Sequence, residues 1–269
     1  MKKSKILFSL LLAGAMVIAA GCGASKAQSS NSNKIVVGAS STPHAEILNH
    51  IKPALKAKGI DLEVKEMNDY VTPNTALNDK QIDANFFQHV PYMEDFEKKH
   101  NMKLVAIAKV HVEPMGAYSS KIKSKSEIKD GSLVAVPNDA TNEGRALILL
   151  QNEGYIKLRS KTDLAQTPRD VVKNPKNLRF QEVEAPQLPR ILQDVDFAII
   201  NTNYALEGKL DPKNALFSEG KDSPYANVLT VRPDNKDSKA VKELVKALHS
   251  NDVKKFILDK YKGAILPAF

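Results

Sequence analysis

Short apolar segments alternate with amphipathic segments from residue 34 almost to the end of the 269-residue chain, and this alternation constrains the fold more than any other feature. Residues 35–37 are apolar and β-branched, which is typical of a buried strand. Residues 41–58 then carry apolar side chains at helical spacing and end at Gly59. Because the same pair of signals recurs along the chain, the sequence predicts an α/β fold with mostly parallel sheets.

The predicted elements fall into two groups, which we expect to form two lobes. Strands are predicted at 35–37, 62–67, 83–89, 104–110, 133–136, 178–183, 197–200 and 226–231, and the main helices at 41–58, 91–100 and 142–153. The pattern of predicted strands passes from one group of elements to the other near 110–115 and near 199–204. These crossings place lobe 1 at 34–110 plus 203–269 and lobe 2 at 111–202. Ligands bind at the carboxyl ends of parallel strands, so we expect a ligand cleft between the lobes, formed by loops 68–74, 137–145 and 201–204.

The first 22 residues have the pattern of an export signal. Lys2, Lys3 and Lys5 form a basic start, and an apolar run follows at 6–20. This run is shorter than the ~20 residues that span a bilayer, which favours a cleaved signal peptide at residues 1–21. Small residues lead directly to Cys22, an arrangement that resembles a bacterial lipobox, with Ala19 where the common pattern has Leu.

Acylation of Cys22, with palmitate among its acyl chains, would anchor the chain to the extracytoplasmic face of the cell membrane. Two or more acyl chains suffice for stable anchoring. Residues 22–33 contain no large apolar side chain after the cysteine and are expected to form a flexible tether. Since Cys22 is the only cysteine, its acylation leaves no thiol for a disulfide or a nucleophile.

The charge pattern argues against a nucleic-acid partner. The formal net charge is +8, and three of the positive charges belong to the leader. Only six of the 39 basic residues are arginine, and the lysines are interleaved with acidic residues. A nucleic-acid-binding surface would instead show clustered basic residues.

The polar segment after the predicted strand 133–136 has the features of a carboxylate site. Thr141 or Asn142 is suited to cap the helix that follows, where backbone N–H groups and the helix dipole favour an anion. Arg145 is expected within the first helical turn, where its planar guanidinium can hold a carboxylate through two hydrogen bonds. A capped helix start with an arginine also occurs as a purely structural feature, so the segment needs support from elsewhere in the chain.

A pair of asparagines gives part of that support. Asn201 and Asn203 follow the predicted strand 197–200. Their amides could accept a hydrogen bond from an ammonium group or donate one to a carboxylate. The same pair would also suit a simple turn.

An aromatic segment at 83–92 could provide an apolar slot. It contains Phe87, His89 and Tyr92, and Tyr70 could join them from the end of the preceding strand. A thioether in such a slot would gain ~0.3–1.5 kcal/mol for each sulfur–aromatic contact. We expect one of Phe86 and Phe87 to belong to the core instead.

Spaced motifs in a fixed order carry a resemblance to a known family. They are Asn68-Asp69-Tyr70, Pro73-Asn74, 83–92, 137–147, 174–177 and 222–225. Together they make the chain similar to the methionine-binding lipoprotein family, the NlpA-type substrate-binding lipoproteins of bacterial ABC importers. The resemblance covers essentially the whole chain after the tether and implies a two-lobed periplasmic-binding-protein fold that encloses its ligand.

The resemblance also implies roles for eight residues. The side-chain pocket would be lined by Tyr70, Phe87, His89 and Tyr92. Asn142 and Arg145 would hold the ligand's carboxylate, and Asn201 or Asn203 would bind its amino group. The sequence is shifted by one residue relative to some relatives around 201–204, which leaves the choice between the two asparagines open. A monomeric receptor that delivers methionine to the permease and ATPase of an importer is implied, with no catalytic residue and no cofactor.

Four other functions remain to be tested. The ligand could be a methionine-containing dipeptide or another small amino acid. A metal-binding receptor could use His44, His89, His111 and Glu113, although these residues lack the spacing of a metal motif. A hydrolase is disfavoured because the sequence has no nucleophile elbow, paired-histidine zinc motif or phosphate loop. An adhesin or scaffold would use the same leader and tether.

Overall fold

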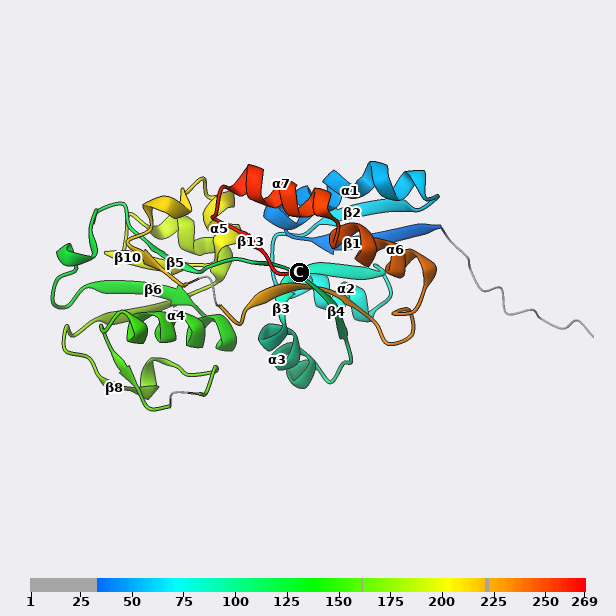
Figure 1. The fold of residues 1–269 in the computed structure, drawn as a ribbon. Helices are drawn as coiled ribbons and strands as arrows, with labels where there is room; N and C mark the ends of the chain where they lie inside the picture. The colour runs from blue at the N-terminus through cyan, green and yellow to red at the C-terminus, as the bar shows by residue number, and fades with distance from the viewer. Residues whose placement is uncertain (1–32, 161, 221–222) are drawn as a thin grey trace, which may run out of the picture. The chain divides into compact units, whose positions relative to one another are not determined.

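The computed structural model describes residues 33–160, 162–220 and 223–269. The expected signal peptide, Cys22 and the tether up to Ser32 lie outside these residues. Within the described ranges, no helix has the length and apolar character needed to cross a bilayer. Two main β-sheets with helices against their faces make up most of this part of the chain, and Figure 1 shows their elements as two groups.

The first sheet has six strands in the order β13-β4-β12-β3-β1-β2. They are β1 (Lys34–Ala39), β2 (Asp61–Glu66), β3 (Ala84–His89), β4 (Val105–Val112), β12 (Ala226–Val231) and β13 (Leu266–Pro267). β1 pairs in parallel with β2 and β3, whereas β12 runs antiparallel between β3 and β4. Every residue of β3 is buried, as expected for a central strand that is covered on both faces.

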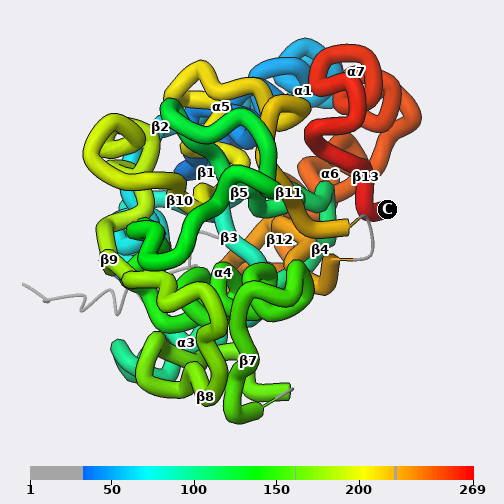
Figure 2. The backbone as a smooth tube through the Cα atoms, turned by 90° about the vertical axis from the view of Figure 1, so that its left-hand side faces the viewer, coloured from blue at the N-terminus to red at the C-terminus, as the bar shows by residue number. Residues whose placement is uncertain are grey.

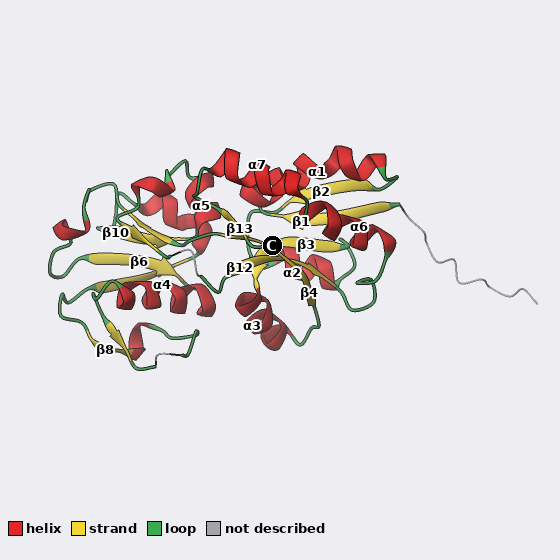
Figure 3. Cartoon of the chain, in the orientation of Figure 1, coloured by secondary structure: helices red, strands yellow, loops and turns green. Residues whose placement is uncertain are grey.

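Helices cover both faces of the first sheet, as Figure 3 shows. The short helix η1 (Ser41–Ala45) leads into α1 (Glu46–Ala57), which packs with α6 (Lys239–Leu248) and α7 (Asn251–Tyr261) on one face. The other face carries α2 (Thr72–Asn78) and α3 (Val90–His100). Ile47, Leu48, Ile51 and Leu55 of α1 are all buried, because the apolar stripe read from the sequence faces the sheet.

The second sheet has five strands in the order β11-β5-β10-β6-β9. They are β5 (Gly116–Tyr118), β6 (Leu133–Pro137), β9 (Arg179–Val183), β10 (Phe197–Ile200) and β11 (Phe217–Ser218). β10 pairs in parallel with β6 and antiparallel with β5, and β11 lies beside β5, as Figure 2 shows. A separate pair of short strands, β7 (Lys157–Leu158) and β8 (Val171–Lys173), completes the strands of the described chain.

Two apolar layers pack against the second sheet. Phe197 and Ile199 belong to the layer under α4 (Ala140–Asn152), whereas Ala198 and Ile200 belong to the opposite layer. That opposite layer is formed by η4 (Ala185–Ile191) and α5 (Thr202–Glu207), and the remaining short helices are η2 (Lys125–Glu127), η3 (Pro168–Asp170) and η5 (Pro212–Asn214). Side chains alternate between the faces of a strand, so a short apolar run such as β10 marks a strand buried on both sides.

The two-lobed α/β fold predicted from the sequence is confirmed, with one difference in strand direction. Each sheet is mixed, because β12, β13, β5 and β11 run antiparallel to their neighbours. The sequence also gave no sign of several short strands, namely β5, β7, β8, β11 and β13. These segments have two or three residues each, too few for a period-of-two pattern to emerge.

The chain passes from the first sheet to the second at 113–115, between β4 and β5, and returns to the first sheet between β11 and β12. The first passage falls where the sequence pattern changes group. The second passage lies after β11, which belongs to the second sheet because it pairs with β5. Helix α5 packs against elements of both groups, namely η1 and η4. The lobe limits at 110/111 and 202/203 stay a prediction.

Candidate functional site

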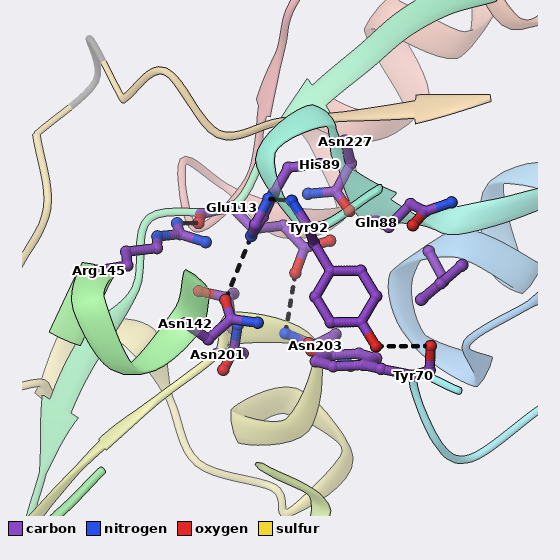
Figure 4. A pocket seen from close by; sticks show the side chains of 12 residues that line it. Tyr70, Gln88, His89, Tyr92, Glu113, Asn142, Arg145, Asn201, Asn203 and Asn227 are labelled. Carbon is purple, nitrogen blue, oxygen red and sulfur yellow. Dashed lines mark hydrogen bonds between the residues drawn. The ribbon is translucent and has the colours of Figure 1, made fainter. Parts of the chain in front are cut away.

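A pocket lies between the elements of the two sheets, and Figure 4 shows most of the side chains that line it. All eight residues singled out in the sequence belong to its lining. Its lining consists of Tyr70, Phe87, Gln88, His89, Tyr92, Glu113, Asn142, Arg145, Asn201, Thr202, Asn203 and Asn227. The first sheet contributes through β3, α3, β12 and the loop after β2, which carries Tyr70. The second sheet contributes through α4 and α5, near the ends of β6 and β10. The segments after the parallel strands β2, β6 and β10 therefore meet at one site, as strand polarity requires.

Three aromatic rings form one wall of the pocket. The ring centroid of Tyr70 lies 5.8 Å from that of Phe87 and 5.7 Å from that of Tyr92, and the Phe87 and Tyr92 centroids are 6.0 Å apart. The hydroxyl of Tyr92 donates to the backbone carbonyl of Tyr70 at 2.9 Å. Aromatic pairs at these separations are worth ~0.5–1.5 kcal/mol each beyond the area they bury. This cluster, Tyr70, Phe87 and Tyr92, is called the aromatic wall below. Phe86, the neighbour of Phe87, is fully buried in the core, so the expectation of one core phenylalanine is correct.

His89 is a neutral imidazole with a fixed tautomer. As the residue that caps α3, it accepts a hydrogen bond at Nδ1 from the backbone N–H of Tyr92 at 3.2 Å. Nδ1 therefore carries no proton, and Nε2–H donates to Oδ1 of Asn142 at 3.2 Å. Burial, followed by the charge of Arg145, lowers the pKa of His89 to about 3. The imidazole stays uncharged at neutral pH.

The start of α4 is capped by Asp139, which the sequence did not single out. Asp139 accepts from the backbone N–H of Asn142 at 3.0 Å, so the expected cap at Thr141 or Asn142 is wrong. The amide of Asn142 is fully engaged: Nδ2 donates to both carboxylate oxygens of Asp139, and Oδ1 accepts from Nδ2 of Asn201 at 2.8 Å. Asn142 thus fixes the orientation of its two neighbours in the pocket, His89 and Asn201.

Asn201 and Asn203 each present one amide atom that has no partner among the described residues. Oδ1 of Asn201 is a buried acceptor and Nδ2 of Asn203 is a buried donor. The remaining amide atoms are held in place, since Nδ2 of Asn201 donates to Asn142 and Oδ1 of Asn203 accepts from the Tyr70 hydroxyl at 2.6 Å. A buried polar atom without a partner is costly, so a ligand with an ammonium and a carboxylate group would satisfy both atoms.

Arg145 lies in the second turn of α4, one turn later than the sequence suggested, because the helix already begins at Ala140. Its side chain is 3% exposed and makes a two-bond contact with Glu219, from Nε at 2.7 Å and from Nη2 at 2.5 Å. Nη2 also donates to the backbone carbonyl of Glu113 at 2.7 Å, and the guanidinium carbon lies 4.3 Å from the centre of the Tyr225 ring. In the described part of the chain only Nη1 of this guanidinium lacks a hydrogen-bond partner.

Glu113 was considered in the sequence only as a metal ligand, and the structure places it in the pocket lining. One carboxylate oxygen, Oε2, accepts from the backbone N–H of Asn203 at 2.9 Å. The other, Oε1, lies 2.7 Å from Nε2 of His111 and 3.2 Å from Nε2 of His44. Burial raises the pKa of Glu113, while the nearby charges and the Asn203 N–H lower it in part.

His44, His111 and Glu113 form the group best suited to a metal ion among the described residues, with candidate ligand atoms within 4.8 Å of one another. His89, the fourth residue of the metal hypothesis, contacts Asn142 instead. A metal-bound histidine normally donates its second ring N–H to an oxygen, but Nδ1 of both His44 and His111 is buried and has no hydrogen-bond partner within the described ranges. The arrangement therefore favours a hydrogen-bonded network around Glu113 over a metal centre.

Sequence reasoning missed the pocket roles of Gln88, Thr202 and Asn227. Gln88 and Thr202 lie inside segments that were singled out, so their positions were in view. Asn227 is the second residue of β12, just after the 222–225 motif, and its Oδ1 accepts from Nε2 of His44 at 2.9 Å. No periodicity marks such a residue, because a buried asparagine in a strand is recognised only once its partners are known.

The two-lobed fold and the polar and aromatic pocket are those of a periplasmic substrate-binding protein. More specifically, the chain belongs to the NlpA lipoprotein family, whose sequence profile matches residues 35–269. It is 44% identical to the methionine-binding lipoprotein MetQ of Bacillus subtilis (strain 168), over 98% of each chain.

Two solved structures extend the comparison. One is a nutrient-binding protein from Burkholderia cenocepacia bound to methionine, with 44% identity, a TM-score of 0.84, and coverage of 87% of this chain and 100% of that one. The other is an ABC transporter periplasmic substrate-binding protein from Coxiella burnetii, with 43% identity, a TM-score of 0.83, and coverage of 87% and 100%. The likeness thus spans nearly all of the described chain.

Proposed function

We propose that this protein captures methionine in the pocket between its lobes and delivers it to an ABC importer. The observation that carries the proposal is that Arg145 and the aromatic wall line the same pocket. The relatives support the choice of ligand, since one is named for methionine binding and another was solved with methionine bound. The Coxiella protein, described as part of an ABC transporter, supports the delivery step.

The atoms left open in the pocket match the groups of a free amino acid. Nη1 of Arg145 and Nδ2 of Asn203 are donors for the carboxylate, and Oδ1 of Asn201 is an acceptor for the ammonium group. The aromatic wall would receive the thioether. In this assignment Asn142 and His89 orient neighbouring groups. Of the two asparagines, Asn201 binds the amino group of the ligand.

Capture of the ligand would favour a closed arrangement of the lobes. A ligand shifts a conformational equilibrium only by the difference in its contacts with the two states. Here Arg145 and Asn201 belong to elements of the second sheet, whereas Phe87 and Tyr92 belong to the first. A molecule that contacts both sets at once gains its full binding energy only when they are close.

Calorimetric titration of the detergent-solubilised chain tests this function, with native mass spectrometry of the protein as purified alongside it. We expect one methionine per chain, displacement of a retained ligand by added methionine, and no turnover of amino-acid esters or peptides. A methionine-containing dipeptide and D-methionine serve as competitors that define the ligand. No heat and no retained mass with any of the three would contradict the proposal, and hydrolysis of a substrate would contradict the non-enzymatic role.

The anchor is a separate part of the proposal and rests on family membership and on the N-terminal sequence. Cys22 would be acylated after removal of residues 1–21, and the lobes would then act at the extracytoplasmic face of the membrane. The measurement is the mass of the mature N-terminal peptide from the membrane fraction. We expect a diacylglyceryl-modified Cys22 that carries palmitate, and loss of membrane association in Cys22→Ser. An unmodified Cys22 in membrane-bound protein would contradict the anchor.

A further inference from the structure

Glu219 is outside the pocket lining but holds the one arginine inside it. Its two carboxylate oxygens accept from Nε and Nη2 of Arg145 at 2.7 and 2.5 Å. This is the parallel two-bond geometry by which a carboxylate fixes a guanidinium plane. The Glu219 side chain is 13% exposed, so water screens the pair only weakly.

Glu219 is itself fixed by the first passage between the sheets. The backbone N–H of Met115 donates to Oε2 of Glu219 at 2.9 Å, and the backbone N–H of Glu219 donates to the carbonyl of Met115 at 2.9 Å. Ser223, from the second passage, donates to the same Oε2 at 3.3 Å. Glu219 therefore occupies the point where the two passages touch, and its carboxylate has a defined direction.

Arg145 is bonded to both passages as a result. Nη2 donates to the carbonyl of Glu113 in the first passage, and Nε and Nη2 donate to Glu219 in the second. Tyr225 lies against the guanidinium from the second passage as well. Among the residues that the structure describes, these contacts occupy two of the three guanidinium nitrogens and one of its faces, which leaves the Nη1 edge for a ligand.

We propose that Glu219 is a positioning residue for ligand recognition: it holds the Arg145 guanidinium so that Nη1 is directed at the ligand's carboxylate. Without this contact the long arginine side chain would regain rotational freedom, and each hydrogen bond to the ligand would then cost side-chain entropy. Glu219 thereby sets how strongly the site prefers a free carboxylate over an uncharged amide. The inference rests on the proposed function and adds a residue that does not touch the ligand.

Glu219→Asp separates position from charge. The shorter side chain keeps the negative charge beside Arg145 but cannot reach Nε, Nη2 and the Met115 N–H together. The quantity to measure is the ratio of the Kd for methioninamide to the Kd for methionine, from calorimetry on the full chain in detergent. Because this ratio does not depend on the fraction of folded protein, a loss of stability cannot imitate the effect. Glu153→Asp is the matched control, since Glu153 pairs with Lys125 at 2.9 Å on the surface.

We expect the ratio to fall about fivefold or more in Glu219→Asp, because the charged hydrogen bond to the carboxylate is weakened, and to keep its wild-type value in Glu153→Asp. An unchanged ratio in Glu219→Asp, whatever happens to the two affinities together, would overturn the inference.

A second readout needs no ligand. The Nε–H proton of Arg145, assigned by its absence in Arg145→Lys, should exchange slowly with water in the wild-type protein and rapidly in Glu219→Asp. Equal exchange in the two proteins would overturn the inference even if methionine binds. If the wild-type protein binds no methionine, the proposed function fails, and this exchange measurement alone decides whether Glu219 positions Arg145.

Discussion

Acid should destabilise this protein through histidines that are buried in the neutral form, and His111→Gln should remove one of these contributions. Burial lowers the pKa of His44 to about 4 and the pKa values of His89 and His111 to about 3, from an ordinary value of 6.5. Below pH 6.5 the unfolded chain therefore binds protons that the folded chain does not. These histidines therefore leave the free energy of unfolding at its full value above that pH, and they lower it as the pH falls towards their folded-state pKa values.

The magnitude follows from proton linkage. Each histidine that is protonated only in the unfolded state lowers the free energy of unfolding by ~1.4 kcal/mol per pH unit. Glu113 and Glu143 act in the opposite sense, because burial raises their pKa values, in the case of Glu143 to about 7, and the folded protein then takes up protons. The pH dependence of the wild-type free energy of unfolding is thus a sum of opposing contributions. The difference between the pH dependences of wild type and His111→Gln gives the contribution of one histidine.

Urea unfolding of the unacylated Cys22→Ser chain, at several pH values between about 7 and 5, measures this difference. The amide of the new glutamine can still donate to Glu113, as Nε2 of His111 does at 2.7 Å, so the network is preserved. We expect the variant's loss of stability between about pH 6 and pH 5 to be smaller than that of wild type by ~1.4 kcal/mol. Parallel curves for the two proteins would refute the idea that His111 is neutral in the folded state.

Three further outcomes are expected. Arg145→Ala should weaken methionine binding by ~1.5–3 kcal/mol, the range for hydrogen bonds to charged groups, and an unchanged calorimetric Kd would remove Arg145 from the site. Gly144→Ala should lower the free energy of unfolding by ~1–3 kcal/mol, because the new Cβ would lie 2.0 Å from the carbonyl oxygen of Leu164; wild-type thermal stability would contradict this packing. Added Zn²⁺ should not raise the melting temperature, and a rise that is abolished in His44→Gln would instead establish a metal site at His44, His111 and Glu113.

The long elements could be predicted from the sequence because their periodicity extends over several turns or residues. The helical stripe of α1 and the apolar run of β10 were both located to within a few residues. The antiparallel course of β12 could not be predicted, since strand direction is set by the chain's return from the second sheet and leaves no trace in local composition. The pairing of β11 with β5 depends in the same way on partners far away in sequence.

The lining of the candidate pocket could be predicted as a set of residues but not as a hydrogen-bonded network, and the roles of these residues towards a ligand stay a prediction. Tyr70 and Arg145 were found because loops after parallel strands converge and because the family motifs contain them. The role of Glu219 was hidden, since an acidic residue in a polar segment is usually a surface residue and its partner Arg145 is 74 positions away. The helix cap was predicted at the wrong residue for a simpler reason. Asp, Thr and Asn are all good caps, and residues 139–142 contain all three.

A crystal structure of the protein grown with methionine would decide whether one pocket recognises both ends of a free amino acid. We expect the carboxylate within about 3.2 Å of Nη1 of Arg145, the ammonium group on Oδ1 of Asn201, and the sulfur against the rings of Tyr70, Phe87 and Tyr92. Methionine bound outside this pocket, or inside it with the carboxylate turned away from Arg145, would contradict the assignment.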